Sequence, residues 1–364
     1  MNSRFQNSLE GFLRRAFRPR GICQIENCVV ATSLGRVRAE NQDRVLHVAQ
    51  LGEFAPRGAT LTVVADGMGG MTNGGRAAEI ASSSFVGSFL EGGGAVEQRL
   101  RNAALQADVD VFSELRGRGG ATITAALVAN GVAFVVSVGD SRAYTYERSF
   151  GLKQVTEDDT LGEMLKKSGS KGIEVDRANQ LVQFIGLGEG VEPHSYVADA
   201  GEGSMLLILS DGAYSVGDDI LRRLCAVNET PQKLAESILA AATSLGGFDN
   251  ASAAVMLHSP SKDLLRDPSA VLCLTAAAGA ELCILLHDAP RVRSRVGEER
   301  AENVEGAALV AERKPISDED VLAKKPRARK KAKKVRKTAK PKSPSSEDTK
   351  SSPGALSLEF PEEG

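Results

Sequence analysis

The balance of apolar and polar residues changes three times along the chain, and each change marks a predicted segment. Residues 1–20 set leucines and phenylalanines among arginines, which predicts a basic amphipathic N-terminal segment. Residues 21–259 carry strand-like and helix-like patterns that are dense enough for one folded domain. Residues 260–290 form an appended apolar element, and residues 291–364 lose the hydrophobic periodicity.

The central segment carries hairpin and helix signals. Helical spacing of apolar residues predicts helices at 74–91, 94–115, 160–168, 218–226 and 231–245. Runs of β-branched and aliphatic residues predict strands at 22–32, 44–50, 60–65, 121–129, 132–138, 142–147 and 204–209. Asn130-Gly131, between two of these runs, is typical of a tight hairpin turn. Because hairpins alternate with paired helices, we expect a layered α+β fold rather than a parallel sheet.

The appended element raises the question of a membrane segment. Residues 270–287 are only just long enough to cross a bilayer, and Glu281 would lie inside the span at a considerable cost in free energy. We therefore expect a hairpin or a buried helix here, no transmembrane segment, and a cytoplasmic protein.

The C-terminal tail, residues 291–364, has too little apolar surface to offset the entropy lost on ordering, so we expect it to be disordered. Its Lys/Arg-rich run at 324–342 has three open interpretations. It could bind nucleic acid or an anionic surface weakly and without sequence preference, through counterion release. It could accompany a short motif, LSLEFPEEG, that docks a kinase or scaffold, or it could be a solvated spacer.

Composition narrows the chemistry. Hydrophobic residues make up 42% and charged residues 25% of the 364-residue chain, which is typical of a soluble globular protein. The five cysteines are odd in number and lack the spacing of a zinc site or disulfide framework, so we expect reduced, buried thiols. No cysteine has an arginine at the Cys-x5-Arg spacing of a thiol phosphatase, which argues against a cysteine nucleophile.

Aspartates stand where several apolar runs begin or end. Asp66 follows TVVA, Asp140 follows VVSVG, Asp211 follows LLILS, Asp249 precedes ASAAVML after one residue, and Asp43 follows GRVRAENQ. Each alone could be a turn or N-cap residue. Together at one sheet edge they would repel one another unless cations neutralised them. Because carboxylate and carbonyl oxygens bind Mg²⁺ and Mn²⁺, the pattern predicts a divalent metal centre.

Six short motifs carry a resemblance to a known family: SLGRVRAENQD (33–43), VVADGMGG (63–70), GGATIT (119–124), VSVGDSRAY (136–144), LSDG (209–212) and DNAS (249–252). In this order they resemble the metal-dependent protein phosphatases of PPM type, also called protein phosphatase 2C-like, and the DGMGG form resembles the bacterial branch. The resemblance implies a four-layer α-β-β-α sandwich of two antiparallel sheets flanked by helices over residues 21–259. It also implies hydrolysis of phosphoserine and phosphothreonine on proteins.

The resemblance implies roles for individual residues. Asp66 is similar to the carboxylate that bridges two metal ions, and Gly67 to the residue whose backbone carbonyl binds one of them. Asp211 and Asp249 resemble the other direct ligands of the first metal. Asp43 resembles a ligand that acts through water.

Two more residues complete the implied centre. Asp140 resembles the binder of a third, weaker metal, and Arg38 resembles the arginine that grips two phosphate oxygens. The implied cofactor is Mn²⁺ or Mg²⁺, two ions per subunit, and the implied nucleophile is a water that the ions activate. The residues implied in catalysis are Arg38, Asp66, Asp211 and Asp249.

The chain departs from the family pattern in several places. Met68 stands where some members have a histidine that is a candidate general acid, and Gln42 where some have an acidic residue. Residues 156–160, TEDDT, replace a Thr-x-Asp-His-Ser-like segment, and His194, which we expect in a loop, belongs to no motif. Substrate choice is therefore less defined by the sequence than metal binding.

We expect phosphorylated proteins as substrates and a cognate bacterial Ser/Thr kinase as the opposing partner. Two alternatives stay open: a phosphatase-like regulator of an anti-sigma pathway, and a catalytically weak binding module that acts through its basic tail. Asp66, Asp211 and Asp249 are all present, which argues against the second alternative, because a pseudoenzyme typically loses a metal ligand.

Overall fold

The fold is that of a computed structural model of the chain. The structure describes residues 3–15, 20–25, 27–49, 58–68, 73–169, 175–199, 201–258, 271–276, 280–285 and 311–312. The chain divides into two units, Met1–Ile316 and Ser317–Gly364. The basic run at 324–342 lies in the second unit and outside the described residues, as does all of the tail except residues 311–312.

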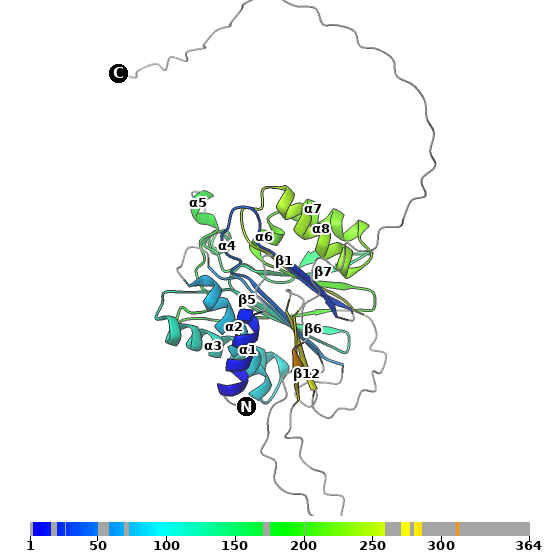
Figure 1. Cartoon of the computed structure of the whole chain (residues 1–364). Coiled ribbons are helices and arrows are strands. Elements are labelled where there is room, and N and C mark those ends of the chain that lie inside the picture. Colours follow the sequence, from blue (N-terminus) through cyan, green and yellow to red (C-terminus); the bar gives the residue numbers. More distant parts are fainter. Residues whose placement is uncertain are drawn as a thin grey trace, which may run out of the picture. The chain divides into compact units, whose positions relative to one another are not determined.

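Two antiparallel sheets form the centre of the first unit (Figure 1). In order across the six-stranded sheet lie β1 (Arg20–Ile25), β2 (Cys28–Ser33), β11 (Ala251–Leu257), β10 (Met205–Leu209), β7 (Arg142–Glu147) and β8 (Gly151–Gln154). In order across the eight-stranded sheet lie β14 (Ala311–Glu312), β13 (Ala280–Leu285), β12 (Val271–Ala276), β3 (Arg44–Ala49), β4 (Thr60–Ala65), β5 (Ile123–Ala129), β6 (Val132–Val138) and β9 (His194–Asp199).

Helices cover the outer face of each sheet (Figure 1). On the eight-stranded sheet lie α2 (Gly74–Glu91) and α3 (Val96–Leu115), with α1 (Ser3–Arg15) against α2. On the six-stranded sheet lie α6 (Asp211–Tyr214), α7 (Asp218–Val227) and α8 (Pro231–Ser244). The connection from β8 to β9 contains α4 (Leu161–Lys167) and α5 (Val175–Ala178). This layering confirms the predicted α-β-β-α sandwich.

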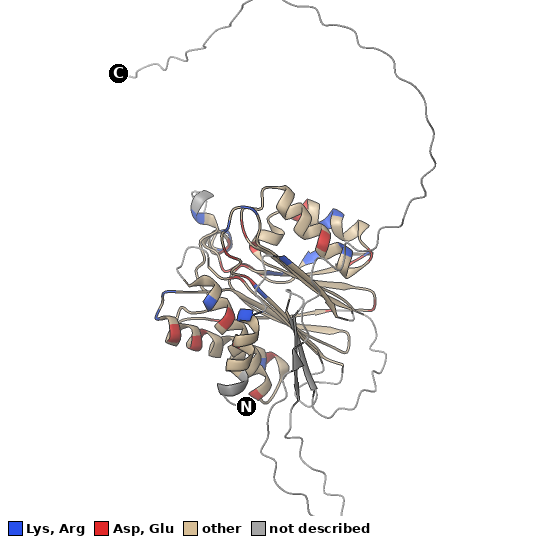
Figure 2. Ribbon diagram, in the orientation of Figure 1, with Lys and Arg blue, Asp and Glu red and all other residues tan. Residues whose placement is uncertain are grey.

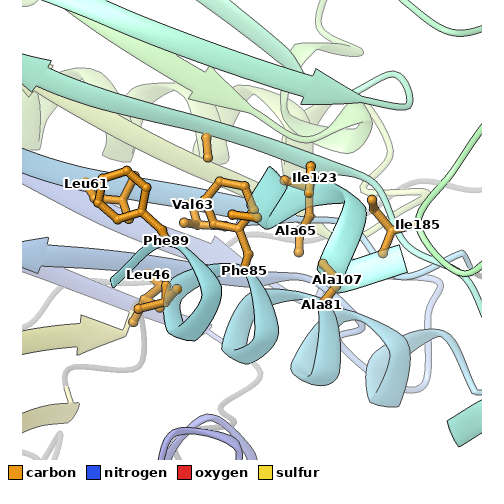
Figure 3. Close-up of a cluster of buried hydrophobic side chains, with 14 of the residues drawn as sticks. Leu46, Leu61, Val63, Ala65, Ala81, Phe85, Phe89, Ala107, Ile123 and Ile185 are labelled. Atoms are coloured by element: carbon orange, nitrogen blue, oxygen red, sulfur yellow. The ribbon is translucent and has the colours of Figure 1, made fainter. Parts of the chain in front are cut away.

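Three buried apolar clusters fill the spaces between the four layers. The first packs Phe85 and Phe89 of α2 against Leu61 and Val63 of β4 (Figure 3). The second lies between the six-stranded sheet and its helices, and the third lies between the two sheets. Because both faces of the central strands are covered, these strands read as continuous apolar runs in the sequence, and all six residues of β2 are buried.

Two sequence-based expectations were wrong. The run 22–32 is not one strand but the hairpin of β1 and β2, in which Ile25 pairs with Cys28. His194 does not lie in a loop but begins β9, an edge strand that pairs with β6. The Asn130-Gly131 turn is present as expected, and both residues have the positive φ, 51° and 79°, that a two-residue hairpin turn requires.

The appended element contains a hairpin that extends the eight-stranded sheet. Its strands β12 and β13 pair antiparallel, and β12 also pairs with β3. Among the described residues, no helix combines the length and the apolar character needed to cross a membrane.

Candidate functional site

The strand register brings the predicted ligands of the eight-stranded sheet to one edge. β3 begins opposite the end of β4, β4 ends beside the start of β5, and β5 begins opposite the end of β6. Asp43 comes directly before β3, Asp66 directly after β4, and Asp140 two residues after β6. The antiparallel ladder therefore gathers three carboxylates that are far apart in the sequence.

The six-stranded sheet supplies the other residues at the same end of the sandwich. β11 begins opposite the end of β2, and β10 ends beside β11 and the start of β7. Asp211 opens α6 after β10, Asp249 lies two residues before β11, and Arg38 lies in the loop after β2. Ser210 Oγ donates to Asp43 Oδ2 at 2.9 Å, which joins the two sheets at this point.

Burial and neighbouring carboxylates raise the pKa of four of these aspartates, Asp43, Asp66, Asp140 and Asp211. Burial is the largest cause for Asp66, whose pKa lies well above its usual range, and the charges of Asp43, Asp211, Asp140 and Asp249 add to it. Burial and then Asp211 and Asp249 raise the pKa of Asp43 to about 6, although two serine hydroxyls oppose the shift. Burial and then Asp211 raise the pKa of Asp140 to about 7. The structure thus brings together all five aspartates that the sequence singled out.

One carboxylate oxygen of Asp43 is buried without a hydrogen-bond partner among the described residues. The residue is 4% exposed, and its Oδ1 has no hydrogen-bond partner among the described residues. Its backbone amide donates to Asn41 Oδ1 at 3.1 Å, which fixes the direction of the turn before β3. A buried carboxylate oxygen without a partner is unfavourable, and a cation or a water on a cation would satisfy it.

Gly67 has a packing reason to be glycine. A Cβ at this position would lie 2.4 Å from the carbonyl oxygen of Gly74 and 2.8 Å from that of Gln42. The preceding residue, Asp66, is held by its backbone amide, which donates to Thr122 Oγ1 at 3.1 Å. A glycine therefore lets the chain turn directly behind Asp66, whether or not its carbonyl also binds a metal.

Arg38 lies at the open side of the aspartate cluster. Its Nη2 donates to Asp249 Oδ2 at 2.6 Å, and its side chain is 39% exposed. This hydrogen bond, together with the charges of Asp211 and Asp66, raises the pKa of the guanidinium. A cavity of about 320 Å³ is lined by Asp211 and Asp249, with the exposed ring of Phe248 on its wall.

The aspartates fit a divalent cation by chemistry but are not in ligand geometry. Within the described residues, no group of three or more His, Cys, Asp or Glu side chains forms a ready-made metal site. The cluster nevertheless supplies carboxylate oxygens and concentrates negative charge, as expected for ligands of a hard cation, with Asp43 buried and the other four aspartates half-buried. The ion pair between Arg38 and Asp249 is one reason why the ligand geometry is absent, because the guanidinium occupies the carboxylate of a predicted ligand.

The sequence did not reveal how the Asp140 loop is supported. Arg142 donates to both carboxylate oxygens of Asp158, through Nε at 2.9 Å and Nη2 at 2.6 Å. The neighbouring Asp159 accepts from the backbone amide of Gly139 at 2.8 Å. These contacts fix the turn that presents Asp140, and two adjacent acids in the segment after β8 were the only sequence signal for them.

The protein phosphatase 2C family model matches residues 28–161 of this chain. The match contains Arg38, Asp43, Asp66 and Asp140, and it ends before α6 and β11. The curated Serine/threonine protein phosphatase PstP of Mycobacterium tuberculosis is 31% identical over 236 residues, which are 61% of this chain and 43% of PstP. The chain therefore spans less than half the length of that relative.

Other similar proteins are covered almost completely. Serine/threonine phosphatase stp of Listeria monocytogenes is 28% identical over 235 residues, which are 60% of this chain and 90% of the relative. The PPM Ser-Thr phosphatase MsPP from Mycobacterium smegmatis, solved with cacodylate, has a TM-score of 0.53 at 28% identity, covering 65% of this chain and 99% of MsPP.

The catalytic domain of PstP, solved with two manganese ions, has a TM-score of 0.54 at 27% identity, covering 64% of this chain and 98% of that domain. These similarities agree with the sandwich layering and with the positions of the motifs at the strand ends. The chain is therefore similar, through residues 28–161 and through its sandwich fold, to the PPM-type or protein phosphatase 2C family of serine/threonine phosphatases.

Proposed function

We propose that the chain is a metal-dependent protein phosphatase that hydrolyses phosphoserine and phosphothreonine. The observation that carries the proposal is the gathering of five aspartates from both sheets at one end of the sandwich, with Arg38 at the open side. Like charges gathered in a partly buried site are unfavourable, so a purely structural role does not explain the arrangement. The similarity to phosphatases named for serine and threonine supports the same activity.

Mn²⁺ or Mg²⁺ is the proposed cofactor, with two ions per subunit and a third, weaker site. The two manganese ions in the PstP catalytic domain support this stoichiometry. Bound divalent ions would supply a nucleophilic water at neutral pH and offset the charge of the phosphate. The proposed ligands are Asp43, Asp66, Gly67, Asp140, Asp211 and Asp249.

Arg38 is the proposed phosphate-binding residue. Its guanidinium can donate to two phosphate oxygens and stays charged at any working pH. Release of Asp249 to a cation would free Arg38 to face the substrate, beside the cavity that Asp211 lines. Met68 cannot donate a proton, so the leaving serine or threonine oxygen would take its proton from water.

Hydrolysis of p-nitrophenyl phosphate by the purified full-length chain is expected to require added Mn²⁺ and to stop in EDTA. The physical reason is that the divalent ions supply the nucleophile. Release of p-nitrophenol measures the rate, and an excess of Mn²⁺ over EDTA should restore it. Full activity in EDTA would rule out a metal-dependent mechanism.

The proposed substrates are phosphorylated proteins. We also propose that a cognate Ser/Thr kinase is the opposing partner and that the protein is cytoplasmic. A comparison of phosphoproteomes from cells with the wild-type chain and with the Asp66→Ala variant would identify the substrates. The basic run at 324–342, on which the alternative of a binding module depends, lies outside the described residues, and the similar proteins are named as serine/threonine phosphatases rather than as anti-sigma regulators.

A further inference from the structure

A buried ion cluster lies outside the proposed metal site and centres on Glu79 of α2. Glu79 Oε1 accepts from Arg44 Nη2 at 2.8 Å, and both side chains are only 7% exposed. Charges this deeply buried are costly unless each is paired and hydrogen-bonded. The cluster therefore depends on its members, which come from α1, α2, α3 and the start of β3.

Arg44 connects this cluster to the backbone that carries Asp43. Its Nη1 donates to the carbonyl oxygens of Asn41 at 3.0 Å and of Asp43 at 2.9 Å. One guanidinium thus holds a carboxylate on α2 and two carbonyls of the turn before β3. Because the donors of a guanidinium are fixed in one plane, these contacts orient the turn relative to α2.

The other carboxylate oxygen of Glu79 faces the N-terminal helix. Its Oε2 lies 3.3 Å from Arg76 Nη1 and 3.5 Å from Arg14 Nε. Arg76 Nη2 in turn donates to Glu10 of α1 at 2.7 Å and to Glu114 of α3 at 2.6 Å. Figure 2 shows acidic and basic stretches close together where α1 meets α2. A continuous series of ion pairs therefore runs from α1 to the Asp43 turn.

Apolar packing holds α1 in place for these contacts. Leu9, Phe12 and Leu13 are buried in the same apolar cluster as the inner face of α2. Glu10 lies on this packed part of the helix, and its side chain is 12% exposed. Because α1 is already ordered by packing, holding Glu10 opposite Arg76 costs little further conformational entropy.

We infer that Arg44 and Glu79 are positioning residues for the proposed ligand Asp43, and that α1 strengthens metal binding through Glu10 and Arg76. The inference rests on the proposed function, because it requires that Asp43 serves a metal ion. Thermodynamic linkage demands reciprocity: if docking of α1 favours the ion, the ion favours docking of α1 by the same factor. This reciprocity provides a readout that is independent of catalysis.

The first measurement is the Mn²⁺ affinity of full-length variants by isothermal titration calorimetry. Arg44→Lys keeps a charge beside Glu79 but loses the planar set of donors, so the Kd for Mn²⁺ is expected to rise about tenfold or more. Glu10→Gln removes only the distal charge, and the Kd is expected to rise about threefold. Arg148→Lys, in an exposed ion pair with Glu229, is the matched control and should leave the Kd unchanged.

The second measurement is hydrogen exchange of the α1 amides with and without Mn²⁺. Exchange in the wild-type chain is expected to slow when Mn²⁺ binds, and Arg44→Lys is expected to lose that protection. Wild-type Mn²⁺ affinity in folded Arg44→Lys would refute the inference and leave the proposed function standing. Folded wild-type chain that binds no Mn²⁺ would refute both.

Circular dichroism shows whether each variant folds. If Arg44→Lys does not fold, Glu10→Gln and the exchange of the wild-type chain decide the question. An unchanged Kd in Glu10→Gln together with α1 exchange that ignores Mn²⁺ would then refute the inference.

Discussion

Replacing Asp66 by asparagine is expected to lower the rate of p-nitrophenyl phosphate hydrolysis by at least about 100-fold, because loss of a residue that merely supports a metal ligand costs about 10–100-fold. Asp66 comes directly after β4, where the charges of the four other aspartates act on it. Asparagine keeps the shape of the side chain but lacks the charge that attracts a divalent cation. The rate is measured with saturating Mn²⁺.

The same substitution is expected to raise the unfolding temperature of the metal-free protein. Burial and like charges make ionised Asp66 unfavourable in the folded state, and the neutral amide removes that cost. Each kcal/mol gained corresponds to about 2–4 °C in a domain of this size. Thermal unfolding in EDTA measures the shift.

Asp219→Asn is the matched control for both measurements. Asp219 lies on α7 with a side chain that is 90% exposed, so neither rate nor unfolding temperature should change. An Asp66→Asn variant with wild-type activity would contradict the role of Asp66 as a ligand. A lower unfolding temperature in EDTA would mean that its carboxylate stabilises the fold instead.

The second large effect is a loss of stability in acid that originates at His47. This histidine lies on β3, is 3% exposed, and has its pKa lowered by burial to about 4. Its Nδ1 is 2.8 Å from Thr62 Oγ1, and that hydroxyl donates to Met256 Sδ of the other sheet. Burial disfavours the charged ring, so the neutral ring is the form that the folded protein stabilises.

The pH range over which stability is lost follows from the protonation of His47 in the unfolded and in the folded chain. An unfolded chain binds a proton on this histidine below about pH 6.5, whereas the folded chain does so only near pH 4. The contribution of neutral His47 to the free energy of unfolding is complete above pH 6.5. It decreases by about 3 kcal/mol as the pH drops to about 4.

Urea unfolding at pH 7 and pH 4.5 tests this contribution of His47. His47→Gln keeps an N–H donor for Thr62 but cannot be protonated, so its stability should decline less between the two pH values than that of the wild-type chain. Comparing the two chains cancels the titration of the carboxylates, which both share. An equal decline in both would contradict the assignment.

Most strands could be predicted because the sandwich covers both faces of its central strands. The apolar runs at 44–50 and 60–65 became β3 and β4, which are almost entirely buried. The division of the run at 22–32 could not be predicted, because the hairpin between β1 and β2 reverses over two residues without a glycine or proline. The edge strand β9 was also not predicted, because an edge strand buries too few residues to produce an apolar run in the sequence.

The aspartates of the site could be predicted because each stands next to a strand end, and an antiparallel ladder brings such ends together. The side-chain contacts that hold these aspartates in place could not be predicted from the sequence. Arg44 and Glu79 are 35 residues apart in the sequence, and either one alone reads as an ordinary surface charge. Asp158 reads as a turn residue until the structure shows Arg142 on both of its oxygens.

Titration of Mn²⁺ into purified, folded, metal-free chain tests most directly whether the separate aspartates form one divalent-metal centre. We predict saturable uptake of about two ions per chain, with uptake abolished or strongly reduced in Asp66→Asn. Wild-type chain that is folded by circular dichroism and takes up no Mn²⁺ would contradict the metal centre and the phosphatase mechanism that depends on it.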